Sequence, residues 1–188
     1  MLTRDIAQKK LDECISNPNL KKHCLAVEAC MVYYANLLGL GEDDKEKWAL
    51  TGLVHDLDWE KYPNLHPHKA VEWLESIQAD ADIINAVAAH GFGFGVEPKT
   101  LMAKVLRAVD ELSGFVVAVA LVKGKSLEAV SVKSVKKKLK DKSFARGVNR
   151  EDIYRGVEEL AQEMDIDFDS HIENVIKALQ EISSVLGL

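Results

Sequence analysis

The chain has 188 residues, of which 47% are hydrophobic and 29% charged, and its formal net charge is −6. This composition is typical of a soluble globular protein and excludes an intrinsically disordered chain. The negative charge argues against bulk nucleic-acid binding and against binding to an anionic membrane surface. The apolar run from Leu112 to Val122 is too short to span a bilayer, so we expect no membrane association.

The three cysteines, Cys14, Cys24 and Cys30, are odd in number and lack the spacing of metal ligands. They are therefore interpreted as reduced thiols that fill the core. The residues after Met1 contain no apolar run of the kind found in a signal peptide. Together these features predict a cytoplasmic protein.

Apolar residues recur at steps of three and four, which predicts helices along most of the chain. Asn19 is the expected cap of the second helix, and Pro67 is tolerated in the first turn of the fourth. No stretch alternates with a period of two, so the predicted fold class is all-α, a compact helical bundle. The helices expected in the first two thirds cover residues 3–16, 19–38, 42–54, 67–77 and 80–90, with a long one from near Thr100.

The last third is rich in lysine between Lys123 and Lys142. Asn149 is expected to cap a helix that runs to about Met164, and Ser170 with Glu173 has the spacing of a capping box for a final helix. No Pro-, Gly- or Ser-rich linker separates this part from the rest. We therefore predict one domain over residues 1–188, with a core at 20–115 and a helical extension at 120–188.

The doublet His55-Asp56 stands where an apolar helix is predicted to end. Adjacent residues on a helix do not face each other, so the two side chains can converge on one point only near a helix end or a break. Imidazole nitrogen with carboxylate oxygen is a ligand set suited to divalent transition metals. The alternative is a surface helix end with a capping histidine.

Other titratable residues fall on apolar helices. His23, His90 and Asp110 each lie in a predicted buried stretch, where a lone carboxylate would be costly unless neutralised or paired. A single histidine on an apolar face is more often a hydrogen-bonded core residue than a ligand. Several such residues on separate helices instead favour a metal site built from facing helices of a bundle. His66 and His68, on either side of Pro67, are close enough in sequence to reach the same pocket.

The order His23, then His55-Asp56, then Asp110 resembles the HD-domain superfamily of metal-dependent phosphohydrolases, which is named for the His-Asp doublet. The resemblance covers roughly residues 20–115. It is strengthened by His66-Pro67-His68-Lys69-Ala70, which is similar to the His-Pro-x-x-small segment of members with two metals. His90 stands where those members carry a further histidine.

The resemblance implies a fold, a ligand set and an activity. A first metal would be held by His23, His55, Asp56 and Asp110, and a second by Asp56, His66 and His90, with His68 as the alternative to His66. Two departures bear on the second metal. The family's common Gly after the doublet is Asp58 here, and one histidine precedes Gly91 where many relatives have two. We expect one or two divalent ions per chain, drawn from Mn, Fe, Co, Ni, Zn and Mg.

The implied function is hydrolysis of a phosphate ester of a small nucleotide or phosphorylated metabolite, with Asp56, His66, His90 and Lys61 as the expected catalytic residues. If a single metal is bound, His66 and His90 would serve the substrate instead. Two other classes stay open, a di-iron oxygenase of the same superfamily and a metal-stabilised regulatory or binding module without turnover. The expected partner is a small phosphorylated substrate, and association of identical copies is left open.

Several other charged residues have a functional and an ordinary interpretation. Lys61 or Arg107 could bring positive charge to phosphate oxygens, and each could equally be a surface residue. The Lys133–Arg150 cluster could attract a polyanionic substrate or be a solvated helix face. Asp58 and Glu60 could orient a ligand or a water molecule. The alternative is that both are ordinary polar residues of a loop. The few aromatic residues are spaced as core residues, which predicts no platform for stacking bases.

Overall fold

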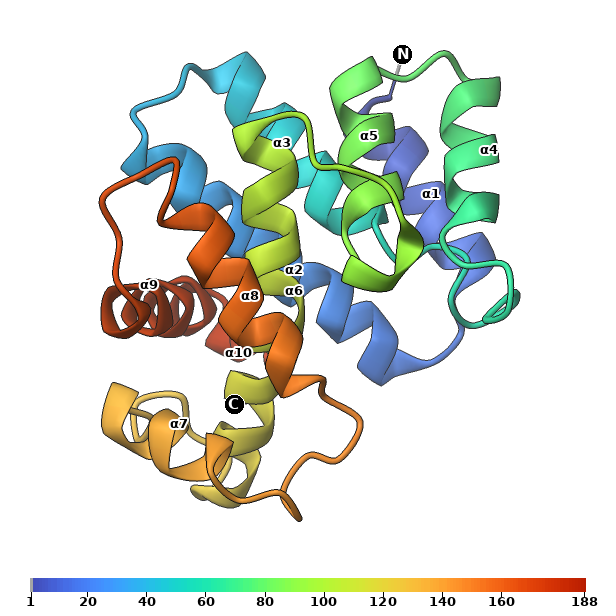
Figure 1. Ribbon diagram of the computed structural model, residues 1–188. Helices are drawn as coiled ribbons and strands as arrows, with labels where there is room; N and C mark the ends of the chain where they lie inside the picture. Colours follow the sequence, from blue (N-terminus) through green and yellow to red (C-terminus); the bar gives the residue numbers. More distant parts are fainter. Residues whose placement is uncertain (1) are drawn as a thin grey trace.

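The computed structural model describes residues 2–188 (Figure 1). Within this range the chain forms α-helices joined by loops and contains no strand, which confirms the predicted all-α fold. The helices are α1 (Arg4–Cys14), α2 (Pro18–Leu37), α3 (Glu42–Val54), α4 (His68–Ser76), α5 (Ala81–Ala89), α6 (Leu101–Val122), α7 (Val132–Leu139), α8 (Arg150–Leu160), α9 (Phe168–Glu181) and α10 (Ser183–Leu186), with a short 3-10 turn, η1 (Phe92–Phe94), between α5 and α6.

The starts of most helices follow from local side-chain capping. The Thr100 hydroxyl accepts a hydrogen bond from the backbone N–H of Ala103, and α6 begins at the next residue, as predicted. The cap of α2 is Asn17 and not Asn19, because Pro18 occupies the first helical position, where its missing N–H costs nothing. The first helical residue of α4 is His68, with Pro67 as its cap.

Two expectations in the last third were wrong at their boundaries. Asn149 caps α8 as expected, but the helix ends at Leu160 rather than near Met164. The proposed capping box of Ser170 and Glu173 does not form, because Asp167 caps α9 by accepting from the N–H of Ser170 three residues later. Near the end of α8 and the start of α9, several polar residues could each have ended or capped the helix, and their spacing in the sequence did not distinguish them.

The core is built around α2 and α6, which pack against each other and carry the two largest fully buried side chains among the described residues. α6 also packs against α5, α8 and α9. Tyr34 of α2 and Phe115 of α6 are fully buried, and burial of such side chains contributes roughly 1.5–3 kcal/mol each. This packing holds α2, α3, α5 and α6 in contact with one another, which is the arrangement that the candidate site needs.

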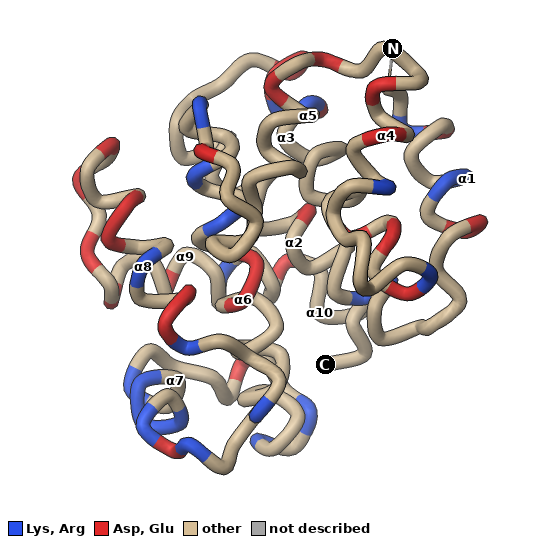
Figure 2. The backbone as a smooth tube through the Cα atoms, turned by 45° about the vertical axis from the view of Figure 1, so that its right-hand side comes forward, with Lys and Arg blue, Asp and Glu red and all other residues tan. Residues whose placement is uncertain are grey.

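Charge is distributed unevenly over the fold. Lysine and arginine residues gather around α7, at the opposite end of the molecule from α4 and α5 (Figure 2). On α7, Lys133 and Lys137 are exposed while Val135 and Leu139 are buried, so the helix turns one face to solvent. Among residues 2–188, no helix combines the length and the apolar character that crossing a membrane would require.

Candidate metal centre

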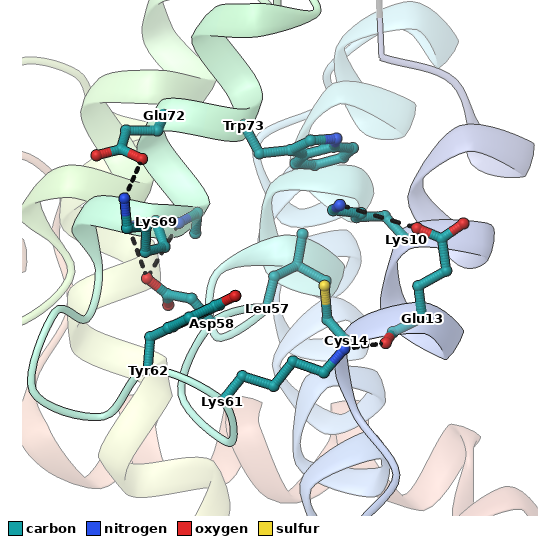
Figure 3. Close-up of a pocket in the computed structure, with 11 residues that line it drawn as sticks. Lys10, Glu13, Cys14, Leu57, Asp58, Lys61, Tyr62, Lys69, Glu72 and Trp73 are labelled. Carbon is teal, nitrogen blue, oxygen red and sulfur yellow. Dashed lines mark hydrogen bonds and ion pairs between the residues drawn. The ribbon is translucent and has the colours of Figure 1, made fainter.

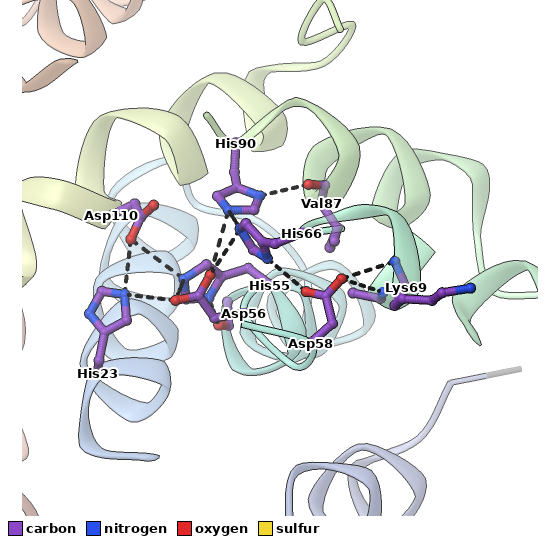
Figure 4. Close-up of polar contacts among 11 residues, drawn as sticks. His23, His55, Asp56, Asp58, His66, Lys69, Val87, His90 and Asp110 are labelled. Carbon is purple, nitrogen blue, oxygen red and sulfur yellow. Dashed lines mark hydrogen bonds and ion pairs between the residues drawn. The ribbon is translucent and has the colours of Figure 1, made fainter. Parts of the chain in front are cut away.

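Six histidine and aspartate side chains meet at one point in the interior (Figure 4). They come from separate elements that the core packing brings together. His23 lies on α2, His55 and Asp56 follow the last residue of α3, and Asp110 lies on α6. The remaining two are His66, in the loop before α4, and His90, at the end of α5.

The first group is formed by His23, His55 and Asp110, whose ligand atoms all lie within 4.8 Å of one another. Oδ1 of Asp110 is 3.0 Å from Nε2 of His23 and 3.4 Å from Nε2 of His55. His55 is fully buried, whereas His23 and Asp110 are partly open to the adjoining pocket. Two imidazole nitrogens and a carboxylate oxygen therefore converge on one point.

The second group is formed by Asp56, His66 and His90, again within 4.8 Å. Oδ1 of Asp56 lies 3.4 Å from Nε2 of His66 and 3.6 Å from Nε2 of His90. All three residues are buried. The structure thus brings together all six residues of the predicted ligand set.

Asp56 lies between the two groups and faces each with a different oxygen. Its Oδ2 is 3.5 Å from Nε2 of His55 and 3.6 Å from Nε2 of His23, while its Oδ1 points to the second group. This is the arrangement expected of a carboxylate that spans two metal positions. It also explains the doublet, because the helix ends at His55 and the next residue is free to turn inward.

The Nδ1 atoms of three imidazoles are fixed by hydrogen bonds that point away from the centre. Nδ1–H of His55 donates to the carbonyl oxygen of Gly52 at 2.8 Å, and that of His90 to the carbonyl of Val87 at 2.6 Å. His66 donates from Nδ1 to Oδ1 of Asp58 at 2.7 Å. Such partners orient a ligating histidine and leave the Nε2 lone pair facing inward.

Two polar features of the centre fit bound cations. Among the described residues, Nε2 of His55 is a buried side-chain atom without a hydrogen-bond partner, and a buried polar atom left unpaired is costly. Nε2 of His66 lies 3.0 Å from Nε2 of His90, although the Nδ1 atom of each ring already donates elsewhere. Two facing lone pairs repel each other unless a cation or a proton lies between them.

The electrostatics of the cluster keep its carboxylates ionised. Burial raises the pKa of Asp56 and of Asp110, but the facing histidines outweigh it and hold both pKa values well below the usual range. Burial lowers the pKa of His55, but Asp56 and Asp110 outweigh burial and raise this pKa to about 9. The centre therefore attracts positive charge.

A pocket of about 420 Å³ opens over the cluster. Glu111, next to Asp110, lines it, and burial together with Asp110 raises the pKa of Glu111 to about 7. Sequence reasoning missed most of this lining, because its members come from loops and from three helices and share no motif. The lining residues outside the six are Trp59, Gly91, Phe92, Gly93, Phe94, Arg107, Glu111, Gly114, Val148 and Asp152.

Aromatic rings form one wall of this pocket, which corrects the expectation that the aromatic residues belong to the core. Trp59 is 47% exposed, and its ring meets the His66 imidazole edge to face with centroids 5.0 Å apart. The Phe94 ring contacts both His66 and His90, at 5.3 and 5.1 Å. These rings cover the second group of ligands on its solvent side.

His68 and Arg107 do not take the roles considered for them. His68 begins α4 with an exposed side chain, and His66 alone of this pair joins the cluster. Arg107 lines the pocket, but its guanidinium donates to the carbonyls of Ala89 and Val96 and pairs with Glu159 at 3.2 Å. It therefore braces the loop after α5 against α6 and α8.

Lys61 is not among the residues that line the pocket over the metal cluster, and Figure 3 shows its side chain beside Glu13 and Cys14. Its Nζ donates to the carbonyl oxygen of Glu13 at 2.6 Å, and it lines a different pocket between α1 and α4. Glu60 is also outside the cluster, since its carboxylate accepts from the N–H groups of Ser16 and Asn17 before α2. The structure does not bring these two residues to the site.

Several residues of the basic cluster make structural contacts within the last third of the chain. Arg150 points inward, where its guanidinium donates to the carbonyl oxygens of residues 139, 141, 144, 145 and 148. Lys136 forms an ion pair with Asp169 of α9, and the Lys138 ammonium lies over the Phe144 ring. Part of this charge is thus used to fold the loop between α7 and α8.

Comparison with known proteins agrees with the site. No match is found among curated proteins or among solved structures. A model of the HD domain family matches residues 20–114, just over half of the chain. This range begins before His23 on α2 and ends after Asp110 on α6, so it contains all six clustered residues. The chain belongs to the HD domain family.

Proposed function

We propose that the protein is a metal-dependent phosphohydrolase that cleaves a phosphate ester of a small nucleotide or phosphorylated metabolite. The observation that carries the proposal is the position of Asp56, whose two oxygens face two separate groups of ligands. Membership of the HD domain family supports it. The two ion positions would be held by His23, His55, Asp56 and Asp110 and by Asp56, His66 and His90.

The donor set favours borderline transition metals, because imidazole nitrogens outnumber carboxylate oxygens. Mn, Fe, Co, Ni and Zn therefore fit better than Mg. When bound, such ions would supply positive charge to the phosphate oxygens and lower the pKa of a water molecule. With one ion in the first group, His66 and His90 would contact the substrate directly.

The residues of the chain have distinct roles in this proposal. Asp56 would offer one oxygen to each position, while Asp58 and the carbonyls of Gly52 and Val87 hold three imidazoles in place. The pocket over the cluster receives the phosphate. In the reaction the oxygen of water bonds to phosphorus, the ester P–O bond breaks, and the alcohol leaves with a proton.

The test begins with metal analysis of protein purified without chelators or a metal-binding tag. Phosphomonoesters, cyclic nucleotides and nucleoside triphosphates are then screened with manganese, cobalt, nickel or iron added. We expect one or two ions per chain and turnover of one ester class. Two irons with oxygen uptake and no hydrolysis would replace the hydrolase by an oxygenase, and bound metal without either activity would indicate a regulatory module.

Histidine variants provide a matched comparison. His55→Ala and His66→Ala each remove a clustered imidazole, and we expect a loss of metal content and at least about a 100-fold loss of turnover. His68→Ala removes an exposed imidazole two residues from His66 and should change neither. Full turnover in His55→Ala protein would remove the basis of the proposal.

A further inference from the structure

A second cavity, of about 360 Å³, adjoins the metal pocket between α2 and α6, with α10 at its far end. We call it the α2–α6 groove. His23 and Gly114 line both this groove and the metal pocket, so the two spaces lie on either side of these two residues. The groove is lined by Asn19, Lys22, His23, Ala26, Gly114, Val117, Ala118, Leu121, Leu186 and Leu188.

The lining of the groove is mainly aliphatic. Val117 and Ala118 of α6 face Ala26 of α2 across it, and Leu121 stands at its edge with 51% of its surface exposed. The Lys22 ammonium donates to the carbonyl oxygen of Leu186 at 2.6 Å, so this charge is already engaged. Apart from the His23 imidazole, the described lining contains no ring on which a nucleobase could stack.

Gly114 lies in the interior of α6, where glycine costs roughly 0.5–1 kcal/mol relative to alanine. The other helical glycines have a packing reason, since a Cβ on Gly52 or Gly156 would lie 2.7 or 2.8 Å from the backbone of a neighbouring helix. A Cβ on Gly114 would meet only Nδ1 of His23, at 3.9 Å. Close helix packing therefore does not require glycine at position 114. The absence of a side chain at Gly114 keeps the space beside His23 open.

The groove points away from the metal ligands along two helices. On α6, Asp110 is followed by Gly114, Ala118 and Leu121 at steps of three and four, so they lie on one face. On α2, His23 and Ala26 share a face in the same way. A molecule with its phosphate at Asp110 and His23 could extend its other end over Gly114 into the groove.

We propose that the α2–α6 groove binds the aliphatic group of the substrate, so that the ester cleaved is that of phosphate with a hydrophobic alcohol. This inference rests on the proposed hydrolase function and narrows its substrate class. Water adds its oxygen to phosphorus, the P–O bond to the aliphatic group breaks, and the alkoxide takes a proton to leave as the alcohol. The rings of Trp59 and Phe94 contact the ligand imidazole of His66 and do not line the groove.

The first experiment compares methyl, butyl and octyl phosphate on the metal-loaded enzyme, with adenosine monophosphate in the same series. The alkanols are leaving groups of similar acidity, so differences in kcat/KM report binding. Each buried methylene should raise kcat/KM about fourfold. Equal rates for methyl and octyl phosphate, or a preference for adenosine monophosphate over octyl phosphate, would overturn the inference.

The second experiment uses two neighbouring exposed residues as a matched pair. Leu121 lines the groove, whereas Val122, which is 60% exposed, does not. We expect Leu121→Gln to reduce the octyl-to-methyl ratio of kcat/KM about tenfold, and Val122→Gln to leave it unchanged. Gly114→Leu should reduce the ratio further, because its side chain would fill the groove beside His23.

A binding measurement separates this inference from the proposed function. Calorimetry with octylphosphonate and methylphosphonate needs no turnover. Suppose that no ester is hydrolysed, that octylphosphonate binds more tightly than methylphosphonate, and that Leu121→Gln but not Val122→Gln weakens octylphosphonate binding. The groove proposal is then supported and the hydrolase proposal is not. If esters are hydrolysed while both phosphonates bind equally, the hydrolase stands and the groove proposal fails.

Discussion

Asp58 illustrates how one side chain can organise a site without contacting a substrate. Oδ1 of Asp58 accepts from Nδ1 of His66, and Oδ2 accepts from the backbone N–H groups of Lys69 and Ala70 at 2.9 and 3.0 Å. The carboxylate is 4% exposed. It therefore fixes the ring of a candidate ligand and the first turn of α4 at once. Of the two interpretations of Asp58, the ligand-orienting one agrees with this geometry.

We predict that Asp58→Asn weakens binding of one metal ion by about 10- to 100-fold, because the neutral amide is a weaker acceptor for His66. Titration of metal-free protein with Mn or Co would measure the affinity. Asp80→Asn is a suitable control, since Asp80 also caps a helix start, at α5, but lies outside the cluster. Unchanged affinity in the Asp58 variant would assign this carboxylate to helix capping alone.

At the scale of the element, close approach between helices decides where the ligands meet. Gly52 lets α3 pack tightly on α2, because a Cβ there would lie 2.7 Å from Cα of Glu28. This contact brings the end of α3, with His55 and Asp56, beside His23 of α2. Gly156 does the same for α8 on α6, at 2.8 Å from Cα of Ala108.

Two glycine substitutions should have opposite effects on stability. Gly156→Ala should lower the free energy of unfolding by about 1–3 kcal/mol, because the added methyl forces α8 away from α6. Gly114→Ala should raise it by about 0.5–1 kcal/mol, because alanine favours the helix and its Cβ meets no close atom. Urea unfolding of both variants checks this, and a loss of stability in Gly114→Ala would give Gly114 a packing role.

At the scale of the molecule, His171 ties the last third of the chain to the core. Its Nε2–H donates to the carbonyl oxygen of Ala108 on α6, at 3.1 Å, and the Tyr34 hydroxyl of α2 donates to its Nδ1, at 2.5 Å. The Tyr34 hydroxyl can donate to Nδ1 only while the ring is neutral, whereas the Ala108 carbonyl can accept from Nε2–H in either protonation state. Burial lowers the pKa of His171 from the ordinary value of 6.5 to about 4. Protonation would therefore remove the acceptor for the Tyr34 hydroxyl, which links α9 to α2, and would place a charge in the core.

We predict a stability loss at acid pH that depends on His171. Below pH 6.5 the unfolded chain takes up a proton that the folded chain excludes, so stability is full above this pH and falls toward pH 4. Between pH 7.5 and 5 this contributes about 2 kcal/mol. His171→Gln keeps a donor and an acceptor but does not titrate, so its urea midpoint should fall less over this range than that of the wild type. Parallel pH dependence in the two proteins would contradict the prediction.

The six clustered residues were all named from the sequence, because the family signature fixes their order along the chain and helix periodicity places them on apolar helices. The choice between His66 and His68 was beyond sequence reasoning, since both flank Pro67 and both could reach the pocket. The structure separates them by burial. Lys61 was considered for the site as a source of positive charge for phosphate oxygens, but its ammonium donates to the carbonyl oxygen of Glu13 near the end of α1.

The sequence by itself determined the all-α class, most helix limits and the six residues that cluster, because these depend on periodicity, capping residues and motif order along the chain. Only the tertiary structure decided which oxygen of Asp56 faces which histidines, where the aromatic wall lies, and that Gly114 opens a groove beside His23. These features arise where helices distant in sequence come into contact. Their geometry is set by the packing of whole helices, which no single segment of the chain encodes.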